Sequence, residues 1–289
     1  MSIPASASLW RCSDKVYDLG SRTFIMGILN VTPDSFSDGG QFYDVDHAIE
    51  HARRLQQDGA DIIDIGGEST RPGAEPLSLD EELARILPVI EKCHAILNVP
   101  ISIDTYKSTV AEKALQAGAS IVNDISGCRF DPDMSRVVAR YKAGLVVMHI
   151  KGEPKNMQMN PHYDDLMSEI TNYFAGSMAL AKAAGVADQQ IVIDPGIGFG
   201  KRLKDNFQIL QELRIFEKLA RPILVGPSRK SFIGRLLDAP PSERLEGTIA
   251  AVTASILYGA HIVRVHDVKE IKRAVTIADA VVGKTNVGD

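Results

Sequence analysis

Residues 24–40 read FIMGILNVTPDSFSDGG, an apolar run that passes directly into a polar, glycine-rich loop. Its first part, Phe24–Leu29, lacks polar alternation, which is typical of a strand buried on both faces. Asn30 stands where the run ends, and Pro33-Asp34 and Gly39-Gly40 supply turn residues after it. An Asn oxygen at the end of a strand can orient a hard cation or a phosphate, although it could equally cap backbone groups of the loop.

Similar short apolar runs recur along the rest of the chain. They are Asp61–Ile65, Pro100–Ile103, Ser120–Asn123, Leu145–Met148, Ile191–Ile193, Ile223–Val225 and Ile262–Val265. Each is rich in Ile and Val and too short for a helix, so each predicts a buried strand. Between them lie patterns with apolar residues at helical spacing, namely Val45–Gln57, Leu79–Leu97, Tyr163–Ala184, Asp205–Leu219, Ser242–Tyr258 and Val268–Val282.

This alternation of strands and helices predicts the fold class. Roughly eight strand–helix units with buried strands favour an α/β protein whose parallel sheet closes into a (β/α)8 TIM barrel. An open, doubly wound sheet is the alternative, but regular units in a chain of 289 residues favour closure. We expect one domain, with an N-terminal arm or hairpin at 1–20, the barrel at 21–283 and a tail at 284–289.

The composition limits the kinds of partner that the chain can bind. The net charge is −5 and the pI is about 5.8, whereas binding to nucleic acid or an anionic membrane favours a basic face. No run approaches the roughly 20 apolar residues of a membrane span, and residues 1–20 lack the apolar core of a signal peptide. The three cysteines are widely spaced, without a metal-binding pattern. We therefore expect a cytoplasmic protein that acts on small molecules, without nucleic-acid or membrane partners.

Polar residues follow nearly every predicted strand. In chain order they are Asn30, Asp64, the segment 66–71, Asp104-Thr105, Asn123-Asp124, His149, Asp194, Ser228-Arg229-Lys230 and Arg264–Asp267. Asp104 could cap a helix that begins near Lys107. Asp194 could form a turn, and His149 could be a hydrogen-bonded core histidine. The complete set is harder to explain in this way, because the carboxyl ends of barrel strands converge on one face, where catalytic groups lie.

The residue types indicate the chemistry of a ligand. Asp104, Asn123 and Asp194 supply hydrogen-bond acceptors from separate strands. Such acceptors suit a flat heterocycle with a guanidine-like donor edge, such as a pterin or guanine. Lys230 can donate to a carbonyl oxygen or ring nitrogen of that heterocycle.

A second group of polar residues follows the last predicted strand. Barrels often bind phosphate in this region. His266 as an anion ligand and Arg264 as a clamp or ring-stacking plane are both chemically reasonable. The sequence therefore predicts an anion site beside the heterocycle.

Several segments carry a pattern that resembles the dihydropteroate synthases, a family of the folate pathway. They are GILNVTPDSFSDG at 27–39, DIGGESTRPG at 64–73, SIDT at 102–105, VND at 122–124, DPGIGFGK at 194–201, GPSRKSF at 226–232 and RVHDV at 264–268. They occur in the order of the family and span most of the chain. The resemblance implies a transferase in which the amine of 4-aminobenzoate displaces pyrophosphate from (7,8-dihydropterin-6-yl)methyl diphosphate, which gives 7,8-dihydropteroate.

The resemblance also implies roles for individual residues. Asn30 resembles the protein ligand of a Mg²⁺ cofactor that acts with the substrate's diphosphate. The implied pterin set is Asp104, Asn123, Asp194 and Lys230, and the implied diphosphate set is Thr70, Arg264 and His266. The implied aminobenzoate set is Phe36, Ser69, Arg71, Pro72 and Ser228. Lys230, Asp104, Arg264 and His266 are the candidates for catalysis.

We expect an SN1-like displacement, because a dihydropterin can support a cation at its methylene group. Asp104 and Asp194 would favour that positive charge, and no covalent nucleophile is evident. The loops Asp34–Gly40 and Gly66–Gly73 would close over the cation and exclude water. The resemblance further implies a homodimer, and the apolar segment 249–257 could form its interface or simply cover the barrel.

Two other functions remain open at this level. A methyltetrahydrofolate-dependent methyltransferase would share the Asp and Asn floor of the barrel, but would not need the diphosphate residues. A non-catalytic pterin-binding paralogue would be expected to lack a site residue, and none is missing here. One departure from the family pattern stands out, because Ile150-Lys151-Gly152 replaces the common Met-Gln-Gly and adds a charge without an evident role.

Overall fold

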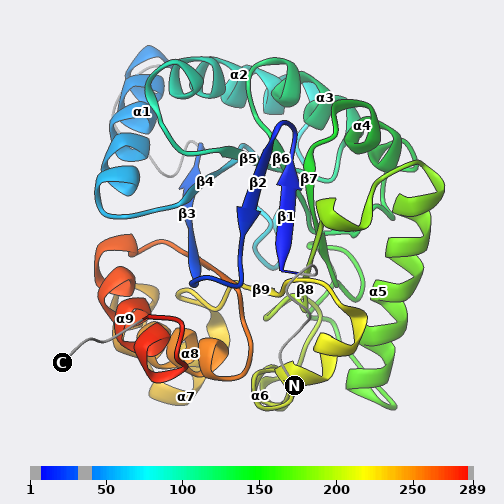
Figure 1. The fold of residues 1–289 in the computed structure, drawn as a ribbon, viewed down its shortest axis with the longest axis vertical. Coiled ribbons are helices and arrows are strands. Elements are labelled where there is room, and N and C mark those ends of the chain that lie inside the picture. Colours follow the sequence, from blue (N-terminus) through cyan, green and yellow to red (C-terminus); the bar gives the residue numbers. More distant parts are fainter. Residues whose placement is uncertain (1–7, 32–40, 286–289) are drawn as a thin grey trace.

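The computed structural model describes residues 8–31 and 41–285. Its main sheet has eight parallel strands in the order β8-β7-β6-β5-β4-β3-β10-β9. The strands are β3 (Phe24–Asn30), β4 (Ile62–Gly66), β5 (Ile101–Asp104), β6 (Ile121–Asp124), β7 (Gly144–Met148), β8 (Ile191–Asp194), β9 (Leu224–Val225) and β10 (Ile262–Val265). A parallel bridge between Ile193 and Ile223 joins the two ends of the sheet. The sheet therefore closes into the predicted (β/α)8 TIM barrel (Figure 1).

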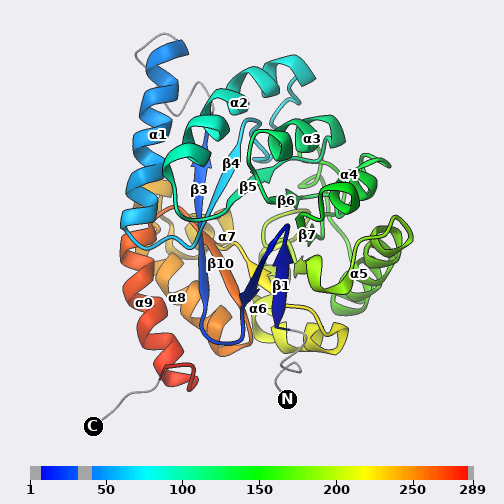
Figure 2. The same ribbon diagram turned by 45° about the horizontal axis from the view of Figure 1, so that its top comes forward.

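Helices surround the barrel in chain order (Figures 1 and 2). They are α1 (Gln41–Gln57), α2 (Leu79–Ile96), α3 (Ser108–Gln116), α4 (Met134–Tyr141), α5 (Leu166–Ala183), α6 (Leu203–Gln211), α7 (Ser231–Leu237), α8 (Leu245–Leu257) and α9 (Val268–Val281). Every predicted strand is present within one residue of its predicted bounds. The apolar runs were a reliable signal because strands covered on both sides need no polar face.

The helices differ from the prediction in two ways. The predicted helix Asp205–Leu219 divides, because α6 is followed by a 3₁₀ helix at Leu213–Leu219. Leu213 and Phe216 are fully buried, and the three-residue period of a 3₁₀ helix directs both into the core. Helices α4 and α7 were not predicted, since segments of 8 and 7 residues contain too few turns for a periodic signal.

A hairpin of β1 (Leu9–Cys12) and β2 (Lys15–Asp18) lies across one end of the barrel (Figures 1 and 2). Trp10 is fully buried there, and its Nε1 donates to the carbonyl of Gln190 at 2.8 Å. Its cluster includes Cys12, Leu19, Phe24, Met26, Ile62, Ile121, Val146, Val192, Leu224 and Ile262. The hairpin thus closes the amino-terminal end of the barrel. The division into arm, barrel and tail stays a prediction.

Side chains two residues apart on each strand share the inside of the barrel. The apolar cluster around Trp10 supplies the inner layer next to the hairpin. Two residues further along the strands stand Asp64, Asn123, Asp194 and Arg264, after Ile62, Ile121, Val192 and Ile262 respectively. The interior therefore changes from apolar to polar toward the carboxyl ends of the strands, which is the end where the site is expected.

Cys12, Cys93 and Cys128 are buried and free. Burial raises the pKa of each thiol, to about 11 for Cys93 and about 12 for Cys128. Within residues 8–31 and 41–285, no helix is long and apolar enough to cross a membrane.

Candidate active site

Arg264, on β10, is the centre of a buried hydrogen-bond network. Its Nε donates to Asp64 Oδ2 and its Nη2 donates to Asp104 Oδ2, each at 2.6 Å. Asn123 Nδ2 donates to the same oxygen of Asp64 at 3.0 Å. Four strands, β4, β5, β6 and β10, therefore bring their polar side chains together at one end of the barrel.

This network holds two carboxyl groups, of Asp64 and Asp104, but one cation, Arg264. Burial disfavours the Arg264 cation, but Asp64 and Asp104 outweigh that effect and raise its pKa. Burial raises the pKa of Asp104, and Asp64 adds to the rise while Arg264 opposes it. Two buried carboxyl groups thus share one guanidinium, which leaves acceptor capacity for another cationic or N–H-rich group.

Three buried oxygens in the described part of the chain lack a hydrogen-bond partner in this region: Asp64 Oδ1, Asp104 Oδ1 and Ser102 Oγ. Ser102 stands two residues before Asp104 on β5, so both face the interior. A buried polar atom without a partner costs about 1–3 kcal/mol, and folded proteins seldom retain several together. Their grouping indicates a place where a ligand with N–H donors completes the hydrogen bonding.

Asp194, at the end of β8, and Lys230, just before α7, form a second pair of opposite charges. Burial lowers the pKa of Lys230 to about 8, against the opposing effect of Asp194. Burial also raises the pKa of Asp194, and Lys230 opposes that rise. Asp194 Oδ1 accepts from the backbone N of Gly196 at 2.7 Å. Asp194 therefore forms the turn with Gly196 that the sequence suggested, and it also faces the Lys230 cation.

Gly226 connects the two pairs in space. A side chain there would begin 3.6 Å from Arg264 Cβ and 3.9 Å from Lys230 Nζ. The glycine thus lies against both cations. Lys230 Nζ also donates to the carbonyl of Ile197 and lies 4.7 Å from the ring centroid of Phe199. The structure therefore brings the four predicted pterin residues, Asp104, Asn123, Asp194 and Lys230, to one site together with Arg264, a predicted diphosphate contact.

His266 lies beside Ser228 at the same end of the barrel. Ser228 Oγ accepts from the backbone N of His266 at 3.2 Å and lies 2.9 Å from its Nδ1. This arrangement favours a proton on Nε2, since the hydroxyl can then donate to Nδ1. Burial lowers the pKa of His266 to about 3, with further lowering by Arg264 and Arg229. His266 is therefore neutral at ordinary pH, and it would meet an anion as an N–H donor.

The predicted aminobenzoate residues are not gathered into one enclosed surface. Ser69, Arg71 and Pro72 are exposed in the loop between β4 and α2, and Ser228 is buried beside His266. Arg71 is close enough to lower the pKa of His266, so its loop lies near the site. Thr70, from the diphosphate set, is half-buried in the same loop. Phe36 lies outside the described residues.

Asn30, the predicted metal ligand, is half-buried at the carboxyl end of β3, where it pairs with Gly66 of β4. Val31 then donates its backbone N to the carbonyl of Gly66 at 2.8 Å. Across residues 8–31 and 41–285, no group of three or more His, Cys, Asp or Glu side chains could hold a metal ion.

Two alternative explanations from the sequence are now decided. The N-cap residue of α3 is Lys107, and its side chain makes no capping hydrogen bond. Asp104 instead pairs with Arg264, so Asp104 is not a helix cap. His149 is buried, with its Nδ1 3.0 Å from Lys201 Nζ. Burial and Lys201 lower the pKa of His149 far below its usual value. His149 is thus a hydrogen-bonded core histidine.

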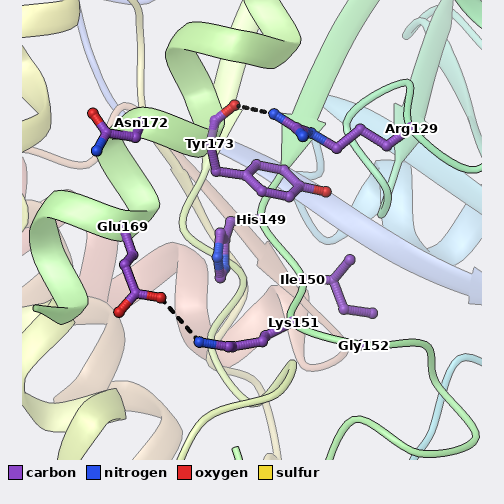
Figure 3. A pocket seen from close by; sticks show the side chains of 8 residues that line it. All are labelled: Arg129, His149, Ile150, Lys151, Gly152, Glu169, Asn172 and Tyr173. Atoms are coloured by element: carbon purple, nitrogen blue, oxygen red, sulfur yellow. Dashed lines mark hydrogen bonds and ion pairs between the residues drawn. The ribbon is translucent and has the colours of Figure 1, made fainter. Parts of the chain in front are cut away.

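A cavity of about 440 Å³ lies between the loop after β7 and α5. It is lined by Arg129, His149, Ile150, Lys151, Gly152, Glu169, Asn172 and Tyr173 (Figure 3). None of the predicted substrate residues lines it. Lys151 Nζ donates to Glu169 Oε2 at 2.9 Å and lies 4.1 Å from the ring centroid of Tyr163. The additional charge of this loop therefore fastens the loop to α5.

Sequence reasoning assigned no role to Asp64, which belongs to the network, or to Ser102, whose unpartnered oxygen lies beside it. The signal was present in the period of two along each strand. Asp64 stands two residues before Gly66, and Ser102 two residues before Asp104, so each faces inward with the predicted site residues. Asp64 was recognised as a polar residue near the end of its strand, but no ligand role was assigned to it, and Ser102 lies one layer further inside the barrel than Asp104.

Comparisons with known proteins agree with this geometry. The family model for pterin binding enzymes matches residues 26–266. The dihydropteroate synthase of Synechocystis is 51% identical over 92% of this chain and 92% of its own. A dihydropteroate synthase from Clostridium difficile, solved in the presence of pteroic acid, has a TM-score of 0.88 and 49% identity, covering 92% of this chain and 98% of its own. The Xanthomonas albilineans enzyme, solved with 4-aminobenzoic acid, has a TM-score of 0.89 and 41% identity, covering 95% of this chain and 98% of its own.

A closed barrel with buried Asp and Asn side chains and half-buried Lys and Arg side chains at its carboxyl end thus defines the class of protein as a pterin-binding barrel enzyme. Within that class, the chain belongs to the dihydropteroate synthase family, because relatives of this family match nearly its whole length at high identity. It is accordingly an enzyme of the transferase class.

Proposed function

We propose that this chain joins (7,8-dihydropterin-6-yl)methyl diphosphate to 4-aminobenzoate. The bond between the pterin methylene carbon and the diphosphate oxygen breaks, and its electron pair leaves with pyrophosphate. The amine nitrogen of 4-aminobenzoate forms the new bond to the same carbon and then loses a proton, which gives 7,8-dihydropteroate. The proposal is supported by family membership and by the reported complexes of related enzymes with pteroic acid and 4-aminobenzoic acid.

The unpartnered oxygens of Asp64 and Asp104 are the observation that carries the proposal. A pterin presents an amino group and ring N–H groups along one edge, and these are the donors that such oxygens lack. Asn123 would add an amide from β6, and Asp194 would accept from the opposite part of the edge. Lys230 would donate to the carbonyl oxygen of the ring, as a cation below its pKa of about 8.

The diphosphate would lie toward the carboxyl end of β10. Arg264 carries a charge that two carboxylates maintain, and neutral His266 offers an N–H donor. Thr70, half-buried in the loop after β4, would add a hydroxyl. These donors would stabilise the negative charge that develops on the leaving oxygen.

Asn30 fits a role as a ligand of Mg²⁺. Its amide oxygen is a hard donor at the carboxyl end of β3, and Mg²⁺ is commonly held by few protein oxygens together with substrate phosphates. When bound, the cation would supply charge neutralisation for the departing pyrophosphate. The other residues of the site would bind and orient the pterin without it.

We propose an SN1-like order of events, in which the C–O bond breaks before the amine attacks. Asp104 and Asp194 would favour positive charge at the methylene group, because both lie in a buried region with low screening. The 4-aminobenzoate would then be held at the mouth of the barrel by the predicted aminobenzoate set, Phe36, Ser69, Arg71, Pro72 and Ser228. The exposure of the first three is consistent with a subsite that is completed when substrate binds.

The proposal is tested by following pyrophosphate release from purified protein with Mg²⁺ and both substrates, beside a Lys230→Ala variant. We expect release that depends on 4-aminobenzoate and is lost in the variant. Pterin binding without such release would instead favour a non-catalytic pterin-binding protein. Release that continues unchanged in Lys230→Ala would contradict the assigned pterin site.

We further propose that the enzyme acts as a homodimer in the cytoplasm. The face of α8 that includes Ala251, Val252 and Ile256 is buried against the barrel, so that part of the apolar segment is not available to a partner. Leu236 on α7 and Ile277 on α9 are 63% and 68% exposed, and such apolar side chains are candidates for an interface. The molar mass in solution, measured by light scattering, tests the dimer.

A further inference from the structure

The loop between β4 and α2, residues 67–78, is fastened at its base by one lysine of another strand–helix unit. Lys107 Nζ, from the start of α3, donates to Glu68 Oε2 at 2.6 Å and to the carbonyl of Leu77 at 2.8 Å. Leu77 N donates to the same oxygen of Glu68 at 2.9 Å. The first and last parts of the loop are thus tied together by the Glu68 carboxylate, which accepts from Leu77 N, and by the Lys107 ammonium group, which donates to both residues.

Two further contacts fix this tie to the barrel. Lys107 Nζ donates to Glu82 Oε2 on α2 at 2.7 Å, and Tyr106 OH donates to Glu68 Oε1 at 2.6 Å. The side chains of Lys107, Glu68 and Glu82 are 20%, 7% and 2% exposed. Charge pairs with so little exposure are weakly screened by solvent. Burial lowers the pKa of Lys107, but its bonds to Glu68 and Glu82 outweigh this and raise it.

The outer part of the loop has more exposed attachments, among them an ion pair between Lys155 Nζ and Glu75 at 2.9 Å whose side chains are 60% and 72% exposed. Ser69, Arg71 and Pro72 are exposed. The backbone contacts there are Gly73 N to the carbonyl of Pro154 at 3.1 Å and Ala74 N to the carbonyl of Arg71 at 3.0 Å. The direction in which these side chains point therefore depends on how the base of the loop is held.

We propose that Lys107 is a positioning residue for the aminobenzoate subsite. It does not touch the substrate. It holds Glu68 and Leu77 together, so that the segment between them presents Ser69, Arg71 and Pro72 toward the mouth of the barrel. The effect on 4-aminobenzoate binding rests on the proposed function. The order of the loop does not, because it can be measured in the protein without substrate. Binding of the pterin ring uses the strand ends and does not involve this tie, whereas Thr70 of the diphosphate set lies within the tied segment.

The first test compares Lys107→Met with the control Lys113→Met, an exposed lysine on the same helix. In Lys107→Met we expect the KM for 4-aminobenzoate to rise about tenfold or more, because misplaced binding groups lose productive contacts. The affinity for a pterin without the diphosphate should stay within about twofold, and Lys113→Met should match the native enzyme. The KM for the pterin diphosphate should rise less than the KM for 4-aminobenzoate, because Thr70 is its one predicted contact in this loop. An equal rise in both KM values, or no rise, would overturn the proposal.

Lys107→Met leaves two buried carboxylates together and could fail to fold. The double variant Lys107→Met/Glu82→Gln removes one charge of each sign, so the net charge of the cluster is unchanged. Glu82→Gln alone keeps Lys107 bonded to Glu68 and Leu77, and serves as the matched control. We expect the aminobenzoate defect in the double variant and near-native kinetics in Glu82→Gln.

Hydrogen exchange of the substrate-free protein separates this proposal from the proposed function. Amides of residues 69–77 should exchange faster in the double variant than in Glu82→Gln, with the barrel strands unchanged. This result would support the positioning role even if the native protein formed no dihydropteroate. Unchanged exchange in residues 69–77 would overturn it, whatever the activity of the native enzyme.

Discussion

Arg264 and Asp64 stand 200 residues apart in the chain, and their Nε and Oδ2 atoms lie 2.6 Å apart in the barrel. Asp64 also accepts from Asn123. One fully buried carboxylate therefore orients a predicted pterin residue and a predicted diphosphate contact from different strands, while its second oxygen stays without a partner. Asp64 thus orients Arg264 and Asn123 through Oδ2, and its Oδ1 is free to accept a hydrogen bond from a bound pterin.

Replacing Asp64 with Asn should weaken pterin binding by about tenfold or more. The amide retains the shape but removes the charge that faces Arg264, and charge-assisted hydrogen bonds are about twice as strong as neutral ones. Titration calorimetry with the pterin substrate measures the change. Affinity equal to that of the native protein would show that Asp64 neither binds pterin nor orients its ligands.

Asp194→Ala should also weaken pterin binding sharply, and it should alter Lys230. Asp194 opposes the lowering of the Lys230 pKa, so its removal should move that pKa further below about 8. The variant also loses the turn contact to Gly196 N, so a folded circular dichroism spectrum is a necessary control. Near-normal pterin affinity in a folded variant would exclude the assigned role of Asp194.

The value of kcat/KM for the pterin substrate should fall as pH rises through about 8. Burial lowers the pKa of Lys230 to about 8, so the folded protein carries the required cation below that pH and loses it above. Lys230→Arg, which stays charged, should remove this alkaline limb of the profile, whatever its maximal rate. An unchanged limb in Lys230→Arg would assign the titration to another group.

Lys230 should affect stability in the opposite direction, because its contribution to the free energy of unfolding rises with pH while kcat/KM falls. The Lys230 pKa is lower in the folded protein than in an unfolded chain, so the unfolded state binds more protons between about pH 8 and 10.5. The contribution of Lys230 to the free energy of unfolding should therefore increase with pH across this range. Comparing urea unfolding of the native protein and Lys230→Met at both ends of the range isolates this contribution.

Trp10→Ala should lower the free energy of unfolding by about 3–5 kcal/mol, the usual cost of a large cavity in a core. Trp10 is fully buried against the amino-terminal layer of the barrel and donates to the carbonyl of Gln190. Both KM values should stay near native, because the substrate residues lie at the other end of the strands. A change in either KM without loss of stability would contradict this separation.

Much of the site could be predicted because its residues stand at strand ends. Once the strands are known, parallel closure brings Asp104, Asn123, Asp194, Lys230 and Arg264 to one end, and the structure agrees. The hydrogen-bond partners could not be predicted in this way. Asp64 lies two residues inside the end of β4, and nothing in its local sequence identifies Arg264 as its partner. The same holds for Lys107, whose acceptors come from the loop after β4 and from α2.

The pattern of amino acids alone predicts the order of the strands, the closed parallel barrel and the residue types at its carboxyl end. These features can be predicted because they follow from short apolar runs and from the turn residues between them, which are local properties of the sequence. The tertiary structure alone decided which carboxylate pairs with which cation, which oxygens remain unpaired and how far burial shifts the pKa of Lys230 and His266. These properties depend on distances of a few ångströms between distant parts of the chain and on removal from water, and neither is set by local sequence.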